Sequence, residues 1–194
     1  MSQIKPAISN TRLIQRPKLI AQSVFYKLNG QWHKPAMQVF MIIIITHLLE
    51  HVFQAYQVYG LGWPRKEALG VLGLAYPWLV HSEWLHYGHA LFMLLGIAAL
   101  RPAIVGRARI WWDITFAIAF YHHFEHALLL GQALTHLNLF NSPVPISIGQ
   151  LWIPRLELHL FYNLIVLIPM LVALYFHRFP PSKTDLNCSR SDHA

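Results

Sequence analysis

The chain has 194 residues, of which 55% are hydrophobic and only 12% are charged. Soluble domains average about 25% charged residues, so this composition excludes an ordinary soluble enzyme and favours one membrane domain. A net charge of +7 would suggest nucleic-acid binding in a soluble protein, but membrane topology accounts for it better here. The single cysteine, Cys188, lies in a polar tail, which excludes an intramolecular disulfide framework and a cysteine metal site.

The chain begins with a basic segment, 1–35, which carries six basic residues and no acid, and which we expect to be cytoplasmic. A four-helix transmembrane domain is predicted over 36–178, and a disordered polar tail over 179–194. The composition therefore predicts an all-α integral membrane protein.

Four apolar stretches in this domain approach or exceed the ~20 residues that span a bilayer. They are residues 37–59, 82–100, 110–133 and 155–176. A shorter apolar stretch, 68–80, is interrupted by Pro77. We expect it to be a re-entrant or interfacial segment, or a kinked extension of the second helix.

The basic residues are distributed asymmetrically over these four spans. If the N-terminus is inside, twelve of the fifteen lie on the inner face, and only Arg65, Lys66 and Arg155 lie outside. The positive-inside rule then predicts that both termini are cytoplasmic (N-in/C-in), in a plasma or inner membrane.

A polar motif occurs twice in the apolar sequence. The segment from His47 to His51 contains Glu50 and recurs 75 residues later. The matched pairs are His47 with His122, Glu50 with Glu125, His51 with His126, Gln57 with Gln132 and, at an offset of 74, Glu83 with Glu157 and His89 with Asn163. The bundle is thus predicted to consist of two parallel two-helix repeats, about 37–105 and 110–178, related by a pseudo-two-fold axis along the membrane normal.

The polar residues of all four helices are expected at one depth. With a rise of about 1.5 Å per residue, each set falls in the outer half of the membrane. Ionisable residues inside a membrane usually face the bundle interior and mark a working site. Imidazole and carboxylate groups from facing helices are the usual ligands of metal sites in bundle cores.

The sequence therefore predicts an intramembrane metal centre. Its expected ligands are His47, Glu50, His51, His86, His89, His122, Glu125, His126, His159 and Asn163. Imidazole and carboxylate without thiolate suit iron, with zinc, manganese and copper as alternatives. The expected catalytic acids are Glu50 and Glu125, which would bridge the metals or orient the imidazoles, and Glu83 and Glu157, which would relay protons near the outer mouth. His81, His123 and His136 are expected to be packing residues.

The spacing of His47 and His51, HxxxH, resembles the first histidine box of membrane fatty-acid desaturases and hydroxylases. The other boxes of that family, HxxHH, are absent, because the runs here read HxxxxHxxH from His81 and HHxxH from His122. The desaturase site also faces the cytoplasm, whereas this cluster is expected towards the outer face. The resemblance covers little of the chain.

The leading hypothesis is a metal-dependent oxidoreductase, with a dinuclear site, that acts on a lipid-soluble substrate such as a quinol, fatty acyl chain or isoprenoid. The alternatives are a haem-binding electron-transfer subunit, a carrier or channel for a metal ion or proton, and a purely structural His/Glu network. The almost wholly apolar inner halves of the helices count against transport. The expected partners are the lipid bilayer and a lipid-soluble small molecule, with no nucleic acid; the chain could also form a homo-oligomer or join a larger membrane complex.

Overall fold

The computed structural model describes residues 22–180. The predicted basic segment up to residue 21 and the predicted tail from residue 181 lie outside this range. The described residues form helices joined by turns and loops, and they contain no strand. The predicted all-α class is therefore confirmed for this part of the chain.

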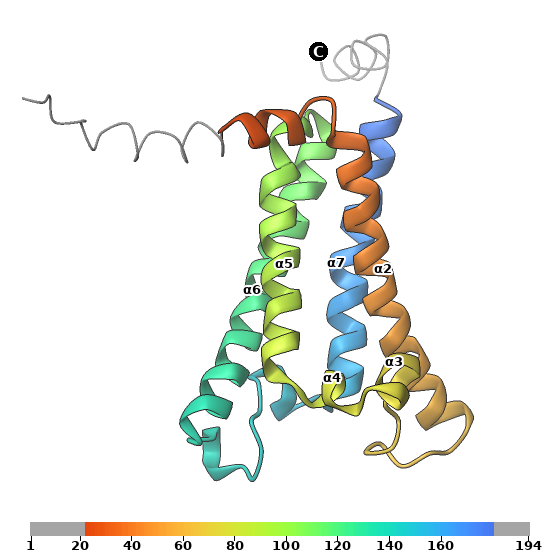
Figure 1. Cartoon of the computed structure of the whole chain (residues 1–194), viewed down its shortest axis with the longest axis vertical. Coiled ribbons are helices and arrows are strands. Elements are labelled where there is room, and N and C mark those ends of the chain that lie inside the picture. Colours follow the sequence, from red (N-terminus) through yellow and green to blue (C-terminus); the bar gives the residue numbers. More distant parts are fainter. Residues whose placement is uncertain (1–21, 181–194) are drawn as a thin grey trace, which may run out of the picture.

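Four long helices run side by side (Figure 1). They are α2 (His33–Ala55), α5 (Glu83–Leu100), α6 (Arg107–Thr135) and α7 (Arg155–Arg178). Each begins and ends within a few residues of a predicted apolar stretch. Helix α6 packs along both α5 and α7, whereas α2 contacts α7 and, least of all, α5. The bundle is therefore looser on the α2–α5 side.

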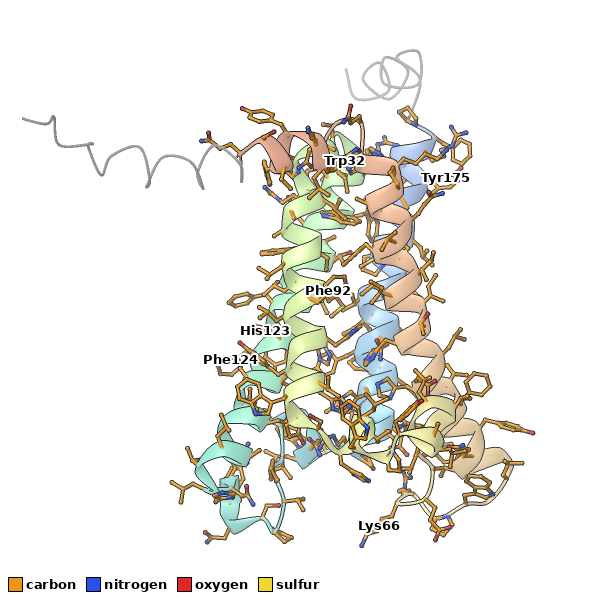
Figure 2. The ribbon with its side chains drawn as sticks, in the orientation of Figure 1. Trp32, Lys66, Phe92, His123, Phe124 and Tyr175 are labelled. Atoms are coloured by element: carbon orange, nitrogen blue, oxygen red, sulfur yellow. The ribbon has the colours of Figure 1, made fainter. Side chains whose placement is uncertain are left out.

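The two ends of the bundle differ in what they carry. Residues 22 and 180 lie at one end, here called the terminal end, and the longer connections lie at the other, here called the loop end (Figure 1). Figure 2 shows Trp32 and Tyr175 at the terminal end and Lys66 at the loop end. A short helix over 22–28 lies across the terminal end. It is held there by Asn29, whose side chain donates to the Ala99 carbonyl at 2.9 Å and accepts from the Ala103 amide at 3.2 Å.

Local sequence signals explain where the helices begin and end. The Ser82 side chain caps α5 by accepting from the Leu85 amide at 3.3 Å, as expected for an N-cap serine. Helix α6 ends at His136, whose backbone is left-handed (φ 56°), and α7 begins directly after Pro154. Helix α2 continues into a π-helical turn, η1 (Tyr56–Gly60), a feature that is frequent at functional sites.

The connections contain further short helices. The predicted break at Pro77 separates α3 (Gly70–Ala75) from α4 (Pro77–His81), in accord with the preference of proline for the first helical position. The connection after α6 contains two 3₁₀ turns, η3 (Leu139–Asn141) and η4 (Gly149–Leu151). A third turn, η2 (Arg101–Ala103), joins α5 to α6 at the terminal end.

The half of the bundle near the terminal end is filled by apolar side chains. This apolar half consists of Met37, Phe40, Met41, Ile44, Met93, Leu94, Ile97, Leu100, Ile104, Ala108, Trp112, Ala119, Val166, Met170 and Ala173. Trp112 is fully buried, and its indole Nε1 donates to the Ile97 carbonyl at 2.8 Å. A close-packed interior of this kind loses stability when a large side chain is removed.

Replacing Trp112 by alanine is expected to lower the free energy of unfolding by about 3–5 kcal/mol, the usual cost of a large cavity. The neighbouring Trp111 is 37% exposed, so Trp111→Ala should cost about 1 kcal/mol or less. Unfolding of both variants in mixed detergent micelles measures the difference. Equal losses would show that α6 does not bury Trp112 in the folded protein.

Large apolar side chains are also exposed on the outside of every long helix. One example on each is Ile42 on α2 (64% exposed), Leu95 on α5 (58%), Phe120 on α6 (59%) and Ile168 on α7 (56%). Figure 2 shows another, Phe124, which projects from the outer side of α6. The helical segments His33–Gly60 and Arg155–Arg178 are long and apolar enough to cross a membrane.

Candidate metal centre

Seven histidine side chains form one continuous cluster in the half of the bundle near the loop end. This histidine cluster consists of His47 and His51 from α2, His86 and His89 from α5, His122 and His126 from α6, and His159 from α7. His51, His122, His126 and His159 are buried, and the other three are half-buried. All seven were predicted as ligands, and the fold brings all seven together.

His159 lies at the centre of the cluster. Its ring centroid lies 5.0 Å from that of His51, 5.2 Å from His126, 5.8 Å from His86 and 6.2 Å from His122. A single imidazole on α7 therefore adjoins imidazoles from the three other long helices.

The remaining histidines extend the cluster away from His159. The ring of His47 stacks on that of His89 with centroids 3.7 Å apart. The Nε2 atoms of His47 and His51 face each other at 3.2 Å. The cluster is thus continuous from the α2–α5 side to the α6–α7 side.

Three of the imidazoles are oriented by hydrogen bonds to carbonyl oxygens. Nδ1 of His51 bonds to the side-chain oxygen of Gln54 at 2.8 Å, and Nδ1 of His86 bonds to the Ser82 carbonyl at 2.9 Å. Nδ1 of His159 bonds to the Arg155 carbonyl at 2.7 Å. A carbonyl oxygen can only accept, so each Nδ1 carries the proton and each neutral ring keeps a lone pair on Nε2. Metal-binding histidines are commonly held in this way.

Several imidazole nitrogens in the cluster are buried without a hydrogen-bond partner. They are Nδ1 of His122, Nδ1 of His126 and Nε2 of His159. Buried polar atoms are nearly always paired in folded proteins. Unpaired nitrogens inside a group of imidazoles therefore fit a site that takes a further ligand, and nitrogen donors suit iron, copper and zinc.

The spacing of four of these rings also fits coordination. Nitrogen ligands lie about 2.0–2.1 Å from a tetrahedral ion, which separates two bound imidazole centroids by roughly 5 Å. His51 and His126 lie 5.0 and 5.2 Å from His159, and His86 lies 5.8 Å from it. The nitrogens do not yet converge, because no three His, Cys, Asp or Glu among residues 22–180 are grouped closely enough to hold an ion as they stand.

The two acids of the repeated motif lie outside the histidine cluster. The Glu50 carboxylate accepts from the Val71 amide at 2.8 Å and from the Leu72 amide at 3.1 Å, at the start of α3. The Glu125 carboxylate accepts from the Gly149 amide at 2.9 Å. Each acid therefore holds the connection that follows its own helix. Within the described chain, neither carboxylate makes a hydrogen bond to a histidine.

The two matched glutamines, Gln57 and Gln132, also bind the backbone of the connection that follows their helix. Gln57 accepts from the Gly70 amide at 2.8 Å and donates to the Gly70 carbonyl at 3.3 Å. Gln132 accepts from the Ile146 amide at 3.3 Å and donates to the Ile146 carbonyl at 2.8 Å. In both places one side-chain amide pairs with both backbone groups of one loop residue.

Gly70 is required at its position for two reasons. Its φ of +76° lies in the left-handed region, and a Cβ there would collide with the Glu50 carboxylate. Glycine alone adopts this conformation without strain and leaves room for the acid. The hydrogen bonds from Glu50 and Gln57 to this connection thus depend on that glycine.

The other two predicted acids form ion pairs at the loop end. The Glu83 carboxylate lies 2.7 Å from the Arg155 guanidinium, which joins the start of α5 to the start of α7. The Glu157 carboxylate lies 2.5 Å from the Arg65 guanidinium and also accepts from the Tyr59 hydroxyl. The hydrogen bonds that the Arg65 guanidinium donates to Glu157 and Tyr59 raise the pKa of Arg65.

The remaining polar residues lie apart from the cluster rings. The Asn163 side chain donates to the backbone carbonyl of His159 at 2.8 Å and, within residues 22–180, makes no hydrogen bond to an imidazole ring. His81 and His136 are exposed. His123 is half-buried against Tyr87, with ring centroids 5.0 Å apart.

Some contributors to the site were not assigned from the sequence. Gln54 faces the cluster, and its spacing of three residues from His51 is a usable signal for that contact. The carbonyls of Ser82 and Arg155 carry no signal in the side-chain pattern, because any residue supplies a carbonyl. Comparison of the chain with protein-family models, curated proteins and solved structures finds no match.

Proposed function

We propose that the protein is a membrane-embedded metal-dependent oxidoreductase in which one histidine from each long helix ligates the metal. The four ligands are His51, His86, His126 and His159. The observation that carries this proposal is the orientation of three of them, since each Nδ1–H is held by a carbonyl and each Nε2 keeps its lone pair, which in His51 faces Nε2 of His47 at 3.2 Å.

The membrane part of the proposal is a four-span bundle. The support is the exposed apolar surface on all four long helices together with polar side chains inside, the reverse of a soluble protein. Among the described basic residues, Arg65, Lys66 and Arg155 belong to the loop end, while Lys27, Lys34, Arg101, Arg107, Arg109 and Arg178 belong to the terminal end. The positive-inside rule then makes the terminal end cytoplasmic.

Two parallel repeats are the simplest account of the matched contacts. Gln57 with Gly70 and Gln132 with Ile146 form the same paired hydrogen bonds. Glu50 and Glu125 both bind the backbone of the connection that follows. We therefore assign these four side chains a positioning role in which they hold the loop end over the histidine cluster.

The proposed metal is iron, with copper next. The donors nearest His159 are all imidazoles, which suit iron, copper and zinc, whereas manganese favours carboxylates. Iron or copper held there would supply one-electron chemistry to a bound substrate. His47, His89 and His122 provide the donors for a second ion beside the first. The apolar half keeps water away from the cluster on the terminal side.

The apolar half also bears on the transport alternative. Ile97, Trp112 and Met170 are fully buried between the cluster and the terminal end. Ions do not cross a close-packed apolar interior without polar partners. This packing supports chemistry at the cluster over passage through it.

Elemental analysis of protein purified in mild detergent, without a metal-affinity tag, tests the proposal. We expect iron or copper close to one or two ions per chain, retained after dialysis against a weak chelator. One iron per chain with a Soret band would replace the proposal with the haem alternative. A chain that binds no iron, copper or zinc, even after reconstitution, would contradict the proposal. The purely structural His/Glu network would then be the better account.

A further inference from the structure

Two cavities, one more polar than the other, reach the histidine cluster and share His51 and His86 in their walls. The first has a volume of about 280 Å³ and is lined at the loop end by Arg65, His81 and Arg155. The second has a volume of about 180 Å³ and has a largely apolar wall. The same imidazoles are therefore open to a polar approach from one direction and to an apolar approach from another.

The apolar cavity lies on the α2–α5 side of the bundle, beneath α3 and α4. Its apolar wall is formed mainly by Leu69, Leu72, Leu79, Val80 and Leu85. The polar part of the wall is formed by the cluster histidines together with Glu50 and Gln54. Helices α2 and α5 are also the pair of neighbours in least contact. In a bilayer, this side of the bundle faces lipid.

The size of the apolar cavity limits what it can admit. Pockets that enclose a whole drug-sized ligand occupy about 300–1,000 Å³, so this cavity has room for a single ring rather than for a long chain. A fatty acyl chain would need an elongated tunnel. The two cavities that reach the histidines have volumes of about 280 and 180 Å³.

The wall at the cluster selects for a polar ring. Imidazole Nε2 lone pairs accept hydrogen bonds from hydroxyl groups, and His86 presents such a lone pair beside this cavity. A molecule with a hydroxylated ring and an apolar tail can hydrogen-bond to the imidazoles and also pack against the apolar residues of the cavity. A purely hydrocarbon isoprenoid would leave the imidazoles without a partner.

We infer that the site binds a quinol by chemical class and that this ligand enters sideways from the membrane, between α2 and α5. Its ring lies in the apolar cavity against His47, His51, His86 and His89, and its tail stays in the lipid. The polar cavity exchanges water and protons with the loop end. This inference rests on the proposed function, because it takes the histidine cluster as the working site.

Photolabelling tests the route without requiring turnover. The probe is an azido-substituted decyl-quinone added to the full chain in lipid nanodiscs, with decylubiquinol as competitor. We expect labelled peptides between residues 47 and 89, and a loss of labelling of about tenfold with excess competitor, as for a specific site. Metal content is measured on the same preparation.

A matched pair of variants locates the entrance. Leu72 lines the apolar cavity and Leu74, on the same short helix, does not; they are 45% and 51% exposed. Leu72→Trp should reduce competed labelling about tenfold, and Leu74→Trp should leave it unchanged, with equal metal content in both variants.

Equal labelling of the two variants would overturn the inference, as would labelling confined to the apolar groove between Leu28 and Phe92 at the terminal end. Labelling of the cavity by a photoreactive fatty acid, blocked by palmitate but not by the quinol, would also overturn it. Protein that contains no metal but shows the expected labelling would sink the proposed function and leave the quinol site standing.

Discussion

Replacing His159 by alanine is expected to remove the metal from the purified protein. His159 is the imidazole that adjoins the cluster members of all three other long helices. Its loss removes one ligand and opens the centre of the site. We expect the apparent affinity for Fe²⁺ or Cu²⁺ to fall by more than the 10–100-fold that is typical when a supporting residue is removed. Competition with a chelator of known affinity measures the change.

Two matched variants complete this experiment. Gln54→Leu removes the oxygen that bonds to Nδ1 of His51 and should weaken binding by about 10–100-fold. His123 lies on the same helix as His126 but packs against Tyr87, so His123→Ala should bind the metal as the wild type does. If His123→Ala loses as much metal as His159→Ala, the assignment of ligands is wrong.

Arginine placed on the outside of α5 or α6 is expected to prevent proper insertion into the membrane. Leu95 and Phe120 are 58% and 59% exposed near the middle of these helices. An arginine at the centre of a membrane helix costs about 2.5–3.5 kcal/mol in insertion experiments. The fraction of chain that resists carbonate extraction, with glycosylation tags in the connections, measures the effect.

The control for this experiment lies outside the helices. Val105 is 71% exposed in the connection between η2 and α6, so Val105→Arg should change insertion by about 0.5 kcal/mol or less, as for ordinary surface substitutions. In a soluble bundle all three arginines would be equally harmless. That outcome would show that α5 and α6 do not span the membrane, and that at most α2 and α7 do.

The positions of the helices and the members of the histidine cluster could be predicted from the sequence. Long apolar stretches bounded by proline and glycine define helices with little ambiguity. His47 and His51, like His122 and His126, lie four residues apart on one helix face. Because a buried imidazole needs a polar partner, the histidines of four adjacent helices could be expected to meet.

The positions of the acids could not be predicted in the same way. Glu50 and Glu125 lie three residues after a cluster histidine, so helix periodicity places them near the same face. Their long side chains reach the backbone of the following connection instead. The path of a loop depends on backbone turns such as that at Gly70, which helix periodicity does not describe. The ion pairs of Glu83 with Arg155 and of Glu157 with Arg65 depend on the paths of the same loops.

Ile97, Trp112 and Met170 are fully buried on the terminal side of the histidine cluster, so the interior of the bundle is apolar in that direction. A proton released at the imidazoles has a polar route past Arg155 and, on the opposite side, only hydrocarbon. In a bilayer, every such proton would therefore leave towards the same compartment. If the proposed function and topology hold, the position of the apolar half alone would set the direction of proton release.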